Sequence, residues 1–191
     1  MRNILGYKIK KPNQELIIMS GIPGCGKSTK AKELAGKNGT IHSTDDVISS
    51  KYDYYEFFKK INFENDYRVL SKMHNENFNN ALKSLKKGNS PVIIDNTNIK
   101  LNDSKSIVVE SLKLGLDEKN IKFIDLGTSG LSAEELFKRN KHGVSIEKIN
   151  SMIQSHKSRG NLTLEKVLNS KDQKYVYKKY NIFQKLLFKF F

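Results

Sequence analysis

The sequence predicts an α/β fold in which a parallel β-sheet is flanked by helices. Apolar runs of strand length, residues 15–19, 91–94 and 120–126, alternate with longer segments whose apolar residues recur at helical spacing. A glycine-rich loop follows the first run, and acidic residues stand at the carboxyl ends of predicted strands. In open α/β folds ligands bind at the carboxyl edge of the parallel sheet, so we expect the functional residues there.

The glycine-rich loop over residues 21–28 reads GIPGCGKS and matches G-x-x-x-x-G-K-[ST], the phosphate-binding P-loop. Glycines let backbone N–H groups point at a phosphate, and the N-terminus of the following helix adds partial positive charge. Lys27 is expected to reach the β- and γ-phosphates of ATP, and the Ser28 hydroxyl to bind Mg²⁺. A P-loop NTPase or kinase fold is therefore predicted. The nucleotide-binding candidates are Gly21, Gly24, Cys25, Gly26, Lys27, Ser28 and Thr29.

Length and composition narrow the class of protein. A chain of 191 residues suits one domain, and its single cysteine, Cys25, excludes an internal disulfide framework. The first residues lack the apolar segment of a signal peptide, and no apolar run approaches the ~20 residues of a transmembrane helix. We therefore expect a cytoplasmic protein.

The formal net charge of +14 favours polyanionic partners such as nucleic acid or an anionic membrane. Most of the excess is lysine, which is abundant along the whole chain, as is asparagine. Such a bias also arises from an AT-rich coding sequence. Charge alone is thus modest support for nucleic-acid binding, and the few arginines stand out by their scarcity.

Acidic residues follow two predicted strands. Asp45 and Asp46 come after a short strand over residues 40–44, and Asp95 follows the strand that ends at residue 94. Either acid of the pair could instead cap the helix that begins there, leaving the other for function. Asp95 fits the group that holds Mg²⁺ in P-loop proteins. The neighbouring Asn96 and Asn98 fit a turn as well as a binding site.

Two segments between these strands have open interpretations. Residues 51–63 place tyrosines and phenylalanines among lysines, which suits either stacking on bases or packing of a short helix onto the core. Residues 65–87 have apolar residues near a period of 3.6 and predict a long helix. His74 lies on its apolar stripe, where it is either a core histidine or a residue on the substrate side.

A basic helical segment over residues 131–158 is predicted to form a lid. It opens with a capping box, Ser132 to Glu135, and carries Lys138, Arg139 and His142 before Gly143 interrupts it. A second helix is expected over residues 145–158. Arg139 could stabilise the charge of a transferring phosphoryl group, although a basic run is also typical of a solvated helix face.

Five segments together resemble the polynucleotide-kinase-like P-loop kinases. This family includes the phage polynucleotide 5′-hydroxyl kinase and the kinase domains of certain animal ubiquitin-ligase-binding proteins. The resemblance covers roughly residues 15–157, and the run IIDNTN followed by KRNKHG is more specific than a P-loop alone. The matching segments are residues 21–29, 43–46, 74–77, 90–98 and 135–145.

The resemblance implies roles for individual residues. Lys27 and Ser28 would bind ATP phosphates and Mg²⁺, and Asp45 would accept the proton of the acceptor 5′-hydroxyl. Asp95 would be the second acidic residue of the site and Arg139 a lid arginine. The acceptor-side candidates are Asp46, His74, Asp95, Asn96, Asn98, Lys138 and His142.

The sequence departs from the phage enzyme at two positions and lacks one domain. Ile48 stands where the phage enzyme has an arginine on the substrate phosphate, and His142 aligns near a second lid arginine. The chain is also too short for the carboxy-terminal phosphatase domain of that enzyme. The resemblance therefore assigns no residues of this chain to recognition of the substrate phosphate at these two positions.

The sequence predicts an ATP-dependent kinase that transfers the γ-phosphate to a hydroxyl, most favourably the 5′-hydroxyl of DNA or RNA. Two alternatives stay open. A small-molecule kinase for a nucleoside, sugar or antibiotic would need an enclosed acceptor pocket rather than an open basic channel. A non-catalytic, nucleotide-dependent nucleic-acid-binding module would keep Lys27 and have no need of Asp45.

The predicted organisation is a basic arm over residues 1–14, a kinase domain over residues 15–170 and a tail over residues 171–191. As a helix, residues 175–191 would have a broad apolar face flanked by lysines. Such a tail suits packing on its own domain, contact with a protein partner or a second copy, or an anionic membrane surface.

Overall fold

The structure, a computed structural model, describes residues 13–64 and 66–171. Its centre is a four-stranded sheet with the order β2-β3-β1-β4, in which every neighbouring pair is parallel. The parallel sheet that the sequence predicts is therefore confirmed. The strands are β1 (Leu16–Ser20), β2 (Thr40–His42), β3 (Val92–Ile94) and β4 (Ile121–Asp125).

Helices follow each strand, as alternation along the chain requires. Among the described residues, none of them has the length and apolar character to cross a membrane. The predicted arm and tail fall outside the described part of the chain, apart from residues 13, 14 and 171. The helices are α1 (Lys27–Ala35), α2 (Thr44–Ser49), α3 (Tyr54–Glu64), α4 (Arg68–Lys87), α5 (Lys105–Lys113), the 3₁₀ turn η1 (Glu118–Asn120), α6 (Ala133–Arg139), α7 (Ile146–Arg159) and α8 (Leu164–Asn169).

Two boundaries differ from those expected. The strand predicted over residues 40–44 ends at His42, because the next residue already caps α2. The basic helix α6 ends at Arg139, since Asn140 has an extended backbone and donates its side-chain amide to the Val144 carbonyl at 2.9 Å.

The sheet separates two apolar layers. Leu16 and Ile18 of β1 pack on the side of α4, α5 and α8, whereas Ile17 and Met19 pack on the side of α1. Successive side chains of a strand point to opposite faces, so a continuous apolar run satisfies both layers. Helices thus cover both faces of the sheet, as predicted.

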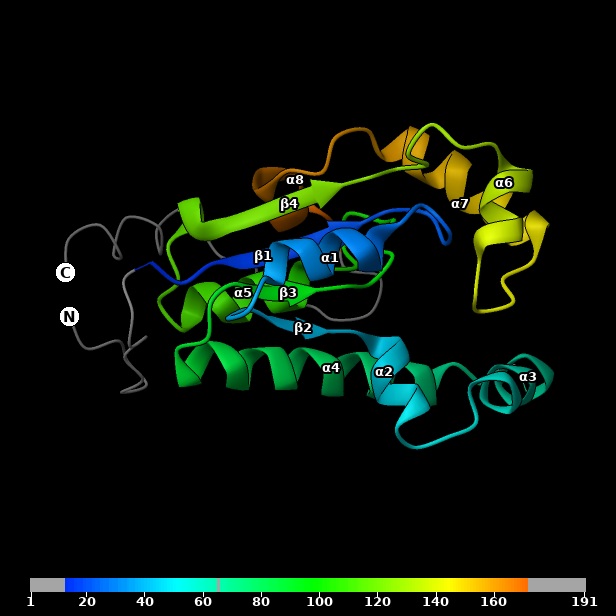
Figure 1. Ribbon diagram of the computed structural model, residues 1–191. Coiled ribbons are helices and arrows are strands. Elements are labelled where there is room, and N and C mark those ends of the chain that lie inside the picture. The colour runs from blue at the N-terminus through cyan, green and yellow to red at the C-terminus, as the bar shows by residue number, and fades with distance from the viewer. Residues whose placement is uncertain (1–12, 65, 172–191) are drawn as a thin grey trace.

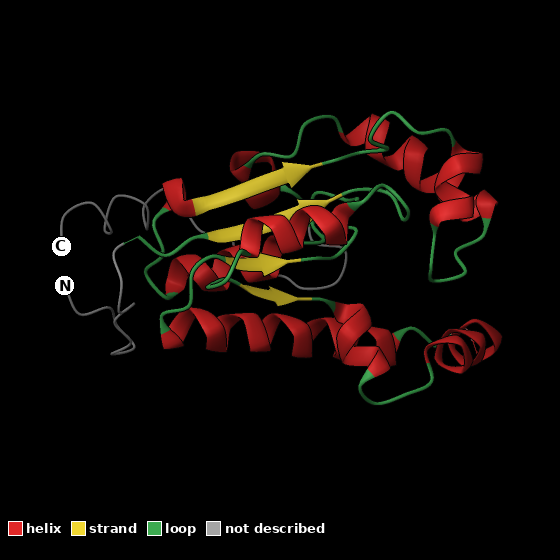
Figure 2. Ribbon diagram, viewed as in Figure 1, coloured by secondary structure: helices red, strands yellow, loops and turns green. Residues whose placement is uncertain are grey.

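All four strands point toward the end of the molecule where α2, α3, α6 and α7 gather (Figures 1 and 2). Helices α6 and α7 lie on one side of this end, and α2 and α3 on the other (Figure 1). The carboxyl edge of the sheet is therefore flanked by the predicted lid and by the predicted acceptor-side elements.

The aromatic segment after α2 forms a helix that packs onto the domain. Phe57 and Ile61 of α3 are buried and form a small cluster with Ile48 and Met73. Other aromatic side chains of the segment face solvent, and Phe63 is 91% exposed. The core-packing interpretation therefore holds for one face of α3, while the other face is open to contacts.

A separate apolar cluster joins the P-loop to the lid. Ile22 and Cys25 pack with Leu136 of α6 and Ile149 of α7, and all four side chains are buried. A Cβ on Gly24 would lie 2.4 Å from the Leu136 carbonyl oxygen, so the loop contacts the helix backbone directly. Helices α6 and α7, the predicted lid, therefore pack directly on the P-loop.

We expect Leu136→Ala to lower the free energy of unfolding by about 2–5 kcal/mol, because it leaves a cavity beneath the P-loop. The neighbouring Phe137 is 45% exposed, so Phe137→Ala should cost clearly less, about 1 kcal/mol. Urea denaturation of both variants measures the difference. Equal losses would contradict the assignment of Leu136 to this cluster.

Candidate active site

The P-loop connects β1 to α1 and is held at its start by two backbone hydrogen bonds. The Gly21 N–H donates to the Thr97 carbonyl at 3.0 Å, and the Ile22 N–H donates to the Gly127 carbonyl at 2.9 Å. Gly26, with φ of 93°, precedes α1, and no side chain caps that helix. The first N–H groups of α1 are therefore left for an anion, which the helix dipole favours.

Lys27 and Asp95 meet at the end of the P-loop. Their Nζ and Oδ1 atoms are 3.4 Å apart, and the side chains are only 12% and 6% exposed. Oδ1 of Asp95 has no hydrogen-bond donor within the described residues. A buried carboxylate oxygen with spare acceptor capacity suits a cation, since Mg²⁺ prefers oxygen ligands.

Ser28 and Thr29 are exposed on the first turn of α1, beside Lys27. No group of three or more His, Cys, Asp or Glu side chains in the described residues is arranged to hold a metal. Mg²⁺ in P-loop proteins takes few protein ligands and completes its shell with phosphate oxygens and water. Ser28 and Asp95 fit that limited role.

The thiol of Cys25 is buried within the loop, and burial raises its pKa even though the charge of Lys27 acts to lower it. A thiol is a nucleophile only as the thiolate, so this environment does not suit covalent chemistry. Cys25 instead packs in the cluster beneath the loop, where its carbonyl accepts a hydrogen bond from Ser129 Oγ at 2.9 Å.

Asp45 lies in the first turn of α2, which follows β2 at the carboxyl edge of the sheet. The N-cap of α2 is Ser43, whose Oγ accepts from the Asp45 N–H at 3.1 Å, so the alternative in which Asp45 caps the helix is wrong. The Asp45 carboxylate instead accepts a hydrogen bond from the Tyr54 hydroxyl at 3.0 Å. Its other oxygen lies 3.6 Å from Nε2 of His142 in the lid.

Three elements thus meet at one carboxylate. The rings of Tyr54 and His142 also contact each other, with centroids 4.8 Å apart. Tyr54 comes from α3 and His142 from the loop between α6 and α7. Sequence reasoning assigned no role to Tyr54, whose only signal was its place in the aromatic segment.

The residues beside Asp45 and Asp95 join the two strand ends. The Thr44 N–H donates to Asn96 Oδ1 at 3.0 Å, and Thr44 Oγ1 is 2.9 Å from Nδ1 of His74. Burial lowers the pKa of His74, so its imidazole is predominantly neutral at pH 7. Asn96 and His74 therefore position α2 relative to β3.

Asn98 is also held in place by contacts within the domain. Its backbone has φ of 42°, its side chain is buried, and its Nδ2 donates to the Met19 carbonyl at 2.7 Å. This amide ties the loop after β3 to β1. The geometry supports a structural role for Asn98 rather than the acceptor contact expected from sequence.

The other predicted residues are more dispersed. Lys138 and Arg139 are exposed on α6 and form no ion pair within the described residues. Asp46 follows Asp45 on α2 but lines a separate pocket, beside β2 and α4. The structure thus brings together Lys27 with Asp95, and Asp45 with the lid, and leaves the basic face of α6 open to a ligand.

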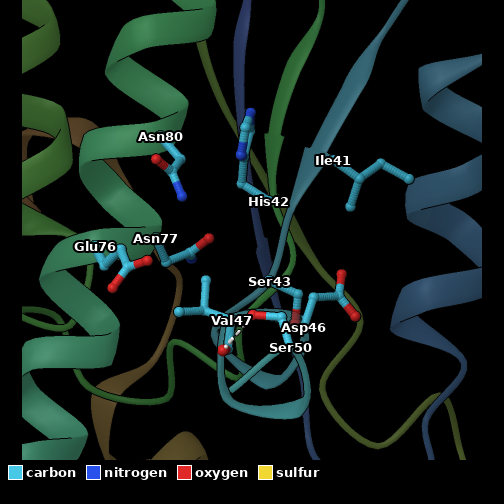
Figure 3. A pocket seen from close by; sticks show the side chains of 9 residues that line it. All are labelled: Ile41, His42, Ser43, Asp46, Val47, Ser50, Glu76, Asn77 and Asn80. Carbon is cyan, nitrogen blue, oxygen red and sulfur yellow. Dashed lines mark hydrogen bonds between the residues drawn. The ribbon is translucent and has the colours of Figure 1, made fainter.

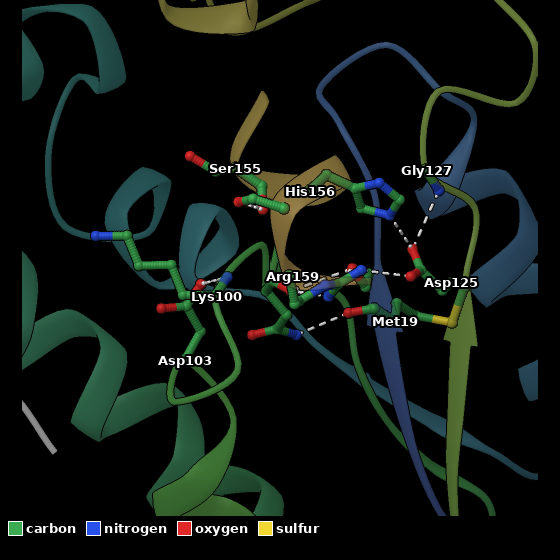
Figure 4. A network of polar contacts seen from close by, with 11 residues as sticks. Met19, Lys100, Asp103, Asp125, Gly127, Ser155, His156 and Arg159 are labelled. Atoms are coloured by element: carbon green, nitrogen blue, oxygen red, sulfur yellow. Dashed lines mark hydrogen bonds and ion pairs between the residues drawn. The ribbon is translucent and has the colours of Figure 1, made fainter. Parts of the chain in front are cut away.

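An ion-pair network at the end of β4 escaped the sequence reasoning. The Arg159 guanidinium, only 3% exposed, pairs with Asp125, and its Nη1 donates to Ser20 Oγ and the Asn98 carbonyl, both at 3.1 Å. His156 Nε2 lies 2.9 Å from Asp125 Oδ1 (Figure 4). The network fastens the end of α7 to the carboxyl edge of the sheet. Two signals could have found it: Asp125 ends a strand as Asp95 follows one, and arginine is scarce in this chain.

The comparisons with known proteins concern the family of the chain. The family described as AAA domain matches residues 16–111. NEDD4-binding protein 2 of Homo sapiens is 35% identical over 146 residues, which cover 74% of this chain and 8% of that protein. The chain therefore spans less than a tenth of the length of this relative. Both findings confirm the resemblance to polynucleotide-kinase-like P-loop kinases.

Two solved structures are also similar. A chain of the Pnkp1/Rnl/Hen1 RNA repair complex has a TM-score of 0.49 and 18% identity, over 78% of this chain and 47% of that one. A chain from a second structure of the Pnkp1/Rnl/Hen1 complex has a TM-score of 0.43 and 26% identity, over 66% of this chain and 38% of that one.

The network at Asp125 predicts an acid-dependent loss of stability. Burial acts to raise the pKa of Asp125, but the hydrogen bond from His156 and the charge of Arg159 outweigh it and lower the pKa below 3.8. A carboxyl group whose pKa is depressed by folding stabilises the fold above its ordinary pKa, and this contribution is lost as pH falls through the folded value. The pH range in which the stabilising contribution of Asp125 is lost therefore lies below about pH 4.

We expect Asp125→Asn to cost about 2–3 kcal/mol at pH 7, because it leaves the buried Arg159 without its anion. Below pH 4 the stabilities of the variant and the native protein should converge. Unfolding curves between pH 2.5 and 7 test this, with Asp117→Asn as the control, because Asp117 makes only an exposed ion pair. If the difference in the free energy of unfolding between the variant and the native protein does not decrease below pH 4, the low pKa of Asp125 is contradicted.

Proposed function

Because this chain belongs to the AAA domain family of P-loop proteins, we propose that it is an ATP-dependent kinase acting on the 5′-hydroxyl of DNA or RNA. One observation carries the proposal. The Thr44–Asn96 hydrogen bond of 3.0 Å joins the immediate neighbours of Asp45 and Asp95. A carboxylate on the acceptor side is thereby held next to the strand end that carries the phosphate-side pair of Asp95 and Lys27.

In the proposed reaction the P-loop N–H groups and Lys27 hold the phosphates of ATP. Asp45 accepts the proton of the acceptor hydroxyl as its oxygen bonds to the γ-phosphorus, and the bond from that phosphorus to the bridging oxygen of ADP breaks. Mg²⁺, held by Ser28 and Asp95, would supply neutralising charge at the phosphates. The protein's contribution is mainly position and electrostatics.

The neighbours of Asp45 suit the role of a general base. The Tyr54 hydroxyl occupies one carboxylate oxygen and fixes the plane of the group. The other oxygen faces His142, which the lid brings to 3.6 Å. An acceptor hydroxyl would take the place of His142 at this oxygen, so opening and closing of the lid would accompany substrate entry. Arg139, exposed at the end of α6, would reach the transferring phosphoryl group when the lid closes over ATP.

A nucleic-acid acceptor is favoured over a small molecule by charge. The chain carries a net charge of +14, and Lys138, Arg139 and Lys141 are exposed on and beside α6. These cations lie on the lid, where they would follow the phosphates of a strand whose end reaches Asp45. A small-molecule acceptor is the alternative, and the acceptor assay below distinguishes the two.

Asp45→Asn should lower kcat about 10²–10⁴-fold while ATP binding is retained, because the amide cannot accept the proton. Lys27→Ala should weaken both ATP binding and transfer. Transfer from γ-labelled ATP to a 5′-hydroxyl oligonucleotide measures the first effect, and titration with ATP measures the second. Asp117→Asn serves as the surface control. Transfer at the native rate by Asp45→Asn would rule out Asp45 as the base.

Binding of single-stranded oligonucleotides should weaken with salt, with a log–log slope of about −0.7 for each phosphate contacted. Lys138→Ala and Arg139→Ala should each make the slope less negative. The same ATP assay, run with nucleosides and sugars as acceptors, tests the alternative. A slope near zero together with transfer to a small acceptor would favour the small-molecule kinase.

A further inference from the structure

The buried side chain of Arg159 contacts three chain segments at the base of the P-loop. Its Nη1 donates to Ser20 Oγ and to the Asn98 carbonyl, both at 3.1 Å, and its Nη2 pairs with Asp125. Ser20 immediately precedes the P-loop, Asn98 lies in the loop after β3, and Asp125 ends β4. By contrast, none of the nine residues that Figure 3 labels around the pocket between α2 and α4 belongs to these segments.

On the β4 side the connection to the P-loop passes through the turn at Gly127. The Gly127 N–H donates to Asp125 Oδ1 at 3.1 Å, and the Gly127 carbonyl accepts the Ile22 N–H of the P-loop at 2.9 Å (Figure 4). His156 packs against the same turn, because a Cβ on Gly127 would lie 3.1 Å from the imidazole Cε1. Since α7 holds the Asp125 carboxylate through His156 and Arg159, it also fixes this turn.

On the β3 side the connection passes through the loop that follows the strand. The Gly21 N–H donates to the Thr97 carbonyl at 3.0 Å, and the carbonyl of the next residue, Asn98, accepts from Arg159. The Ser20 hydroxyl donates to the same Asn98 carbonyl at 3.1 Å. One guanidinium thus holds the ends of two neighbouring strands, which its planar arrangement of N–H donors allows.

The P-loop depends on such support because it binds phosphate through the direction of its backbone N–H groups. Its glycines allow many conformations, and no side chain caps the helix that follows it. No hydrogen bond or ion pair joins Arg159 to residues 21–28 within the described part of the chain. Any effect of Arg159 on a bound phosphate must therefore act through the two loops to which the P-loop is hydrogen-bonded.

We propose that Arg159 and its partner Asp125 are positioning residues for the P-loop, which set its affinity for the phosphates of a nucleotide. The inference rests on the proposed function only for the identity of that nucleotide, ATP. Arg159 is the last residue of α7, and Ile149 of the same helix packs in the cluster that joins the P-loop to the lid. One lid helix thus supports the loop at two separate places.

Arg159→Lys tests the proposal, because lysine keeps the charge beside Asp125 but lacks the planar set of donors that reaches the other acceptors. The full-length variant should bind ATP about three- to tenfold more weakly, as expected for the loss of one hydrogen bond. The KM for ATP should rise as well, while the KM for a 5′-hydroxyl oligonucleotide should keep its native value. Calorimetric titration with ATP and Mg²⁺ measures the affinity.

Arg68→Lys is the matched control and should bind ATP as the native protein does. Arg68 also makes a bidentate pair, with Asp66 at 2.8 and 2.7 Å, but it is exposed at the start of α4. Should Arg159→Lys fail to fold, His156→Ala replaces it, because this change removes a contact with the Gly127 turn at a partly exposed side chain. It should weaken ATP binding in the same direction.

Two further measurements separate positioning from a general loss of stability. Val167→Ala, at a fully buried residue of α8 in the opposite core layer, should lower the melting temperature and leave ATP affinity unchanged. Inorganic tripolyphosphate, which displaces ATP from the P-loop, should be weakened in Arg159→Lys by about the same factor as ATP. Equal weakening of ATP binding in Val167→Ala, or native affinity of Arg159→Lys for tripolyphosphate, overturns the proposal.

Failure of this inference can be distinguished from failure of the proposed function. Weaker ATP binding by Arg159→Lys supports the positioning role, even where the native protein phosphorylates no oligonucleotide. Native ATP affinity in Arg159→Lys, together with transfer to an oligonucleotide, overturns the positioning role and leaves the proposed function standing. Absence of ATP binding by the native protein overturns both.

Discussion

The two backbone hydrogen bonds from Gly21 and Ile22 to the loops after β3 and β4 are the constraint on which the site depends. They fix the start of the P-loop to both strands that flank β1. A loop with several glycines has much conformational freedom to lose, so its ordered form needs such anchors. The anchors come from the sheet, whose central strand is buried on both faces. The hydrogen bonds to the rigid sheet thereby restrict the conformations of the phosphate-binding loop.

Polar groups at the carboxyl edge fall into two classes. Asp125 and Arg159 pair with each other and fasten α7 to the sheet, although Nε of Arg159 has no hydrogen-bond partner among the described residues. By contrast, Asp95 Oδ1, Asn96 Nδ2 and the Asn77 carboxamide are buried without hydrogen-bond partners in the described part of the chain. Local rules of stability are commonly broken where a protein binds something. The first class holds α7 on the sheet, and Asp95 of the second lies beside Lys27 of the P-loop, where the proposed function expects Mg²⁺.

The lid is coupled to both ends of the proposed reaction. Through Leu136 it rests on the P-loop, where Gly24 allows contact with the backbone of α6. Through His142 it contacts the carboxylate of Asp45 on the acceptor side. A displacement of α6 and α7 would therefore change the surroundings of donor and acceptor together. Such coupling would link phosphate binding to acceptor binding in a transfer enzyme.

By itself the sequence determined the local features, because each depends on residues close together in the chain. The P-loop, the alternation of strands and helices and the capping box at Ser132 are of this kind, and all are present in the structure. Parallel strands expose their carboxyl ends at one edge, so the placement of Asp45 and Asp95 there also followed from sequence.

Only the tertiary structure decided which side chains meet across that edge. The contacts of Tyr54 with Asp45, of Arg159 with Asp125 and the unpaired state of Asn77 depend on packing between elements far apart in sequence. The periodicity of apolar residues predicts which face of a helix a residue lies on, but it does not predict which other element that face contacts. Asn98 is an example. Its sequence motif suggested a contact with the acceptor, whereas in the structure its side chain donates a hydrogen bond to the Met19 carbonyl.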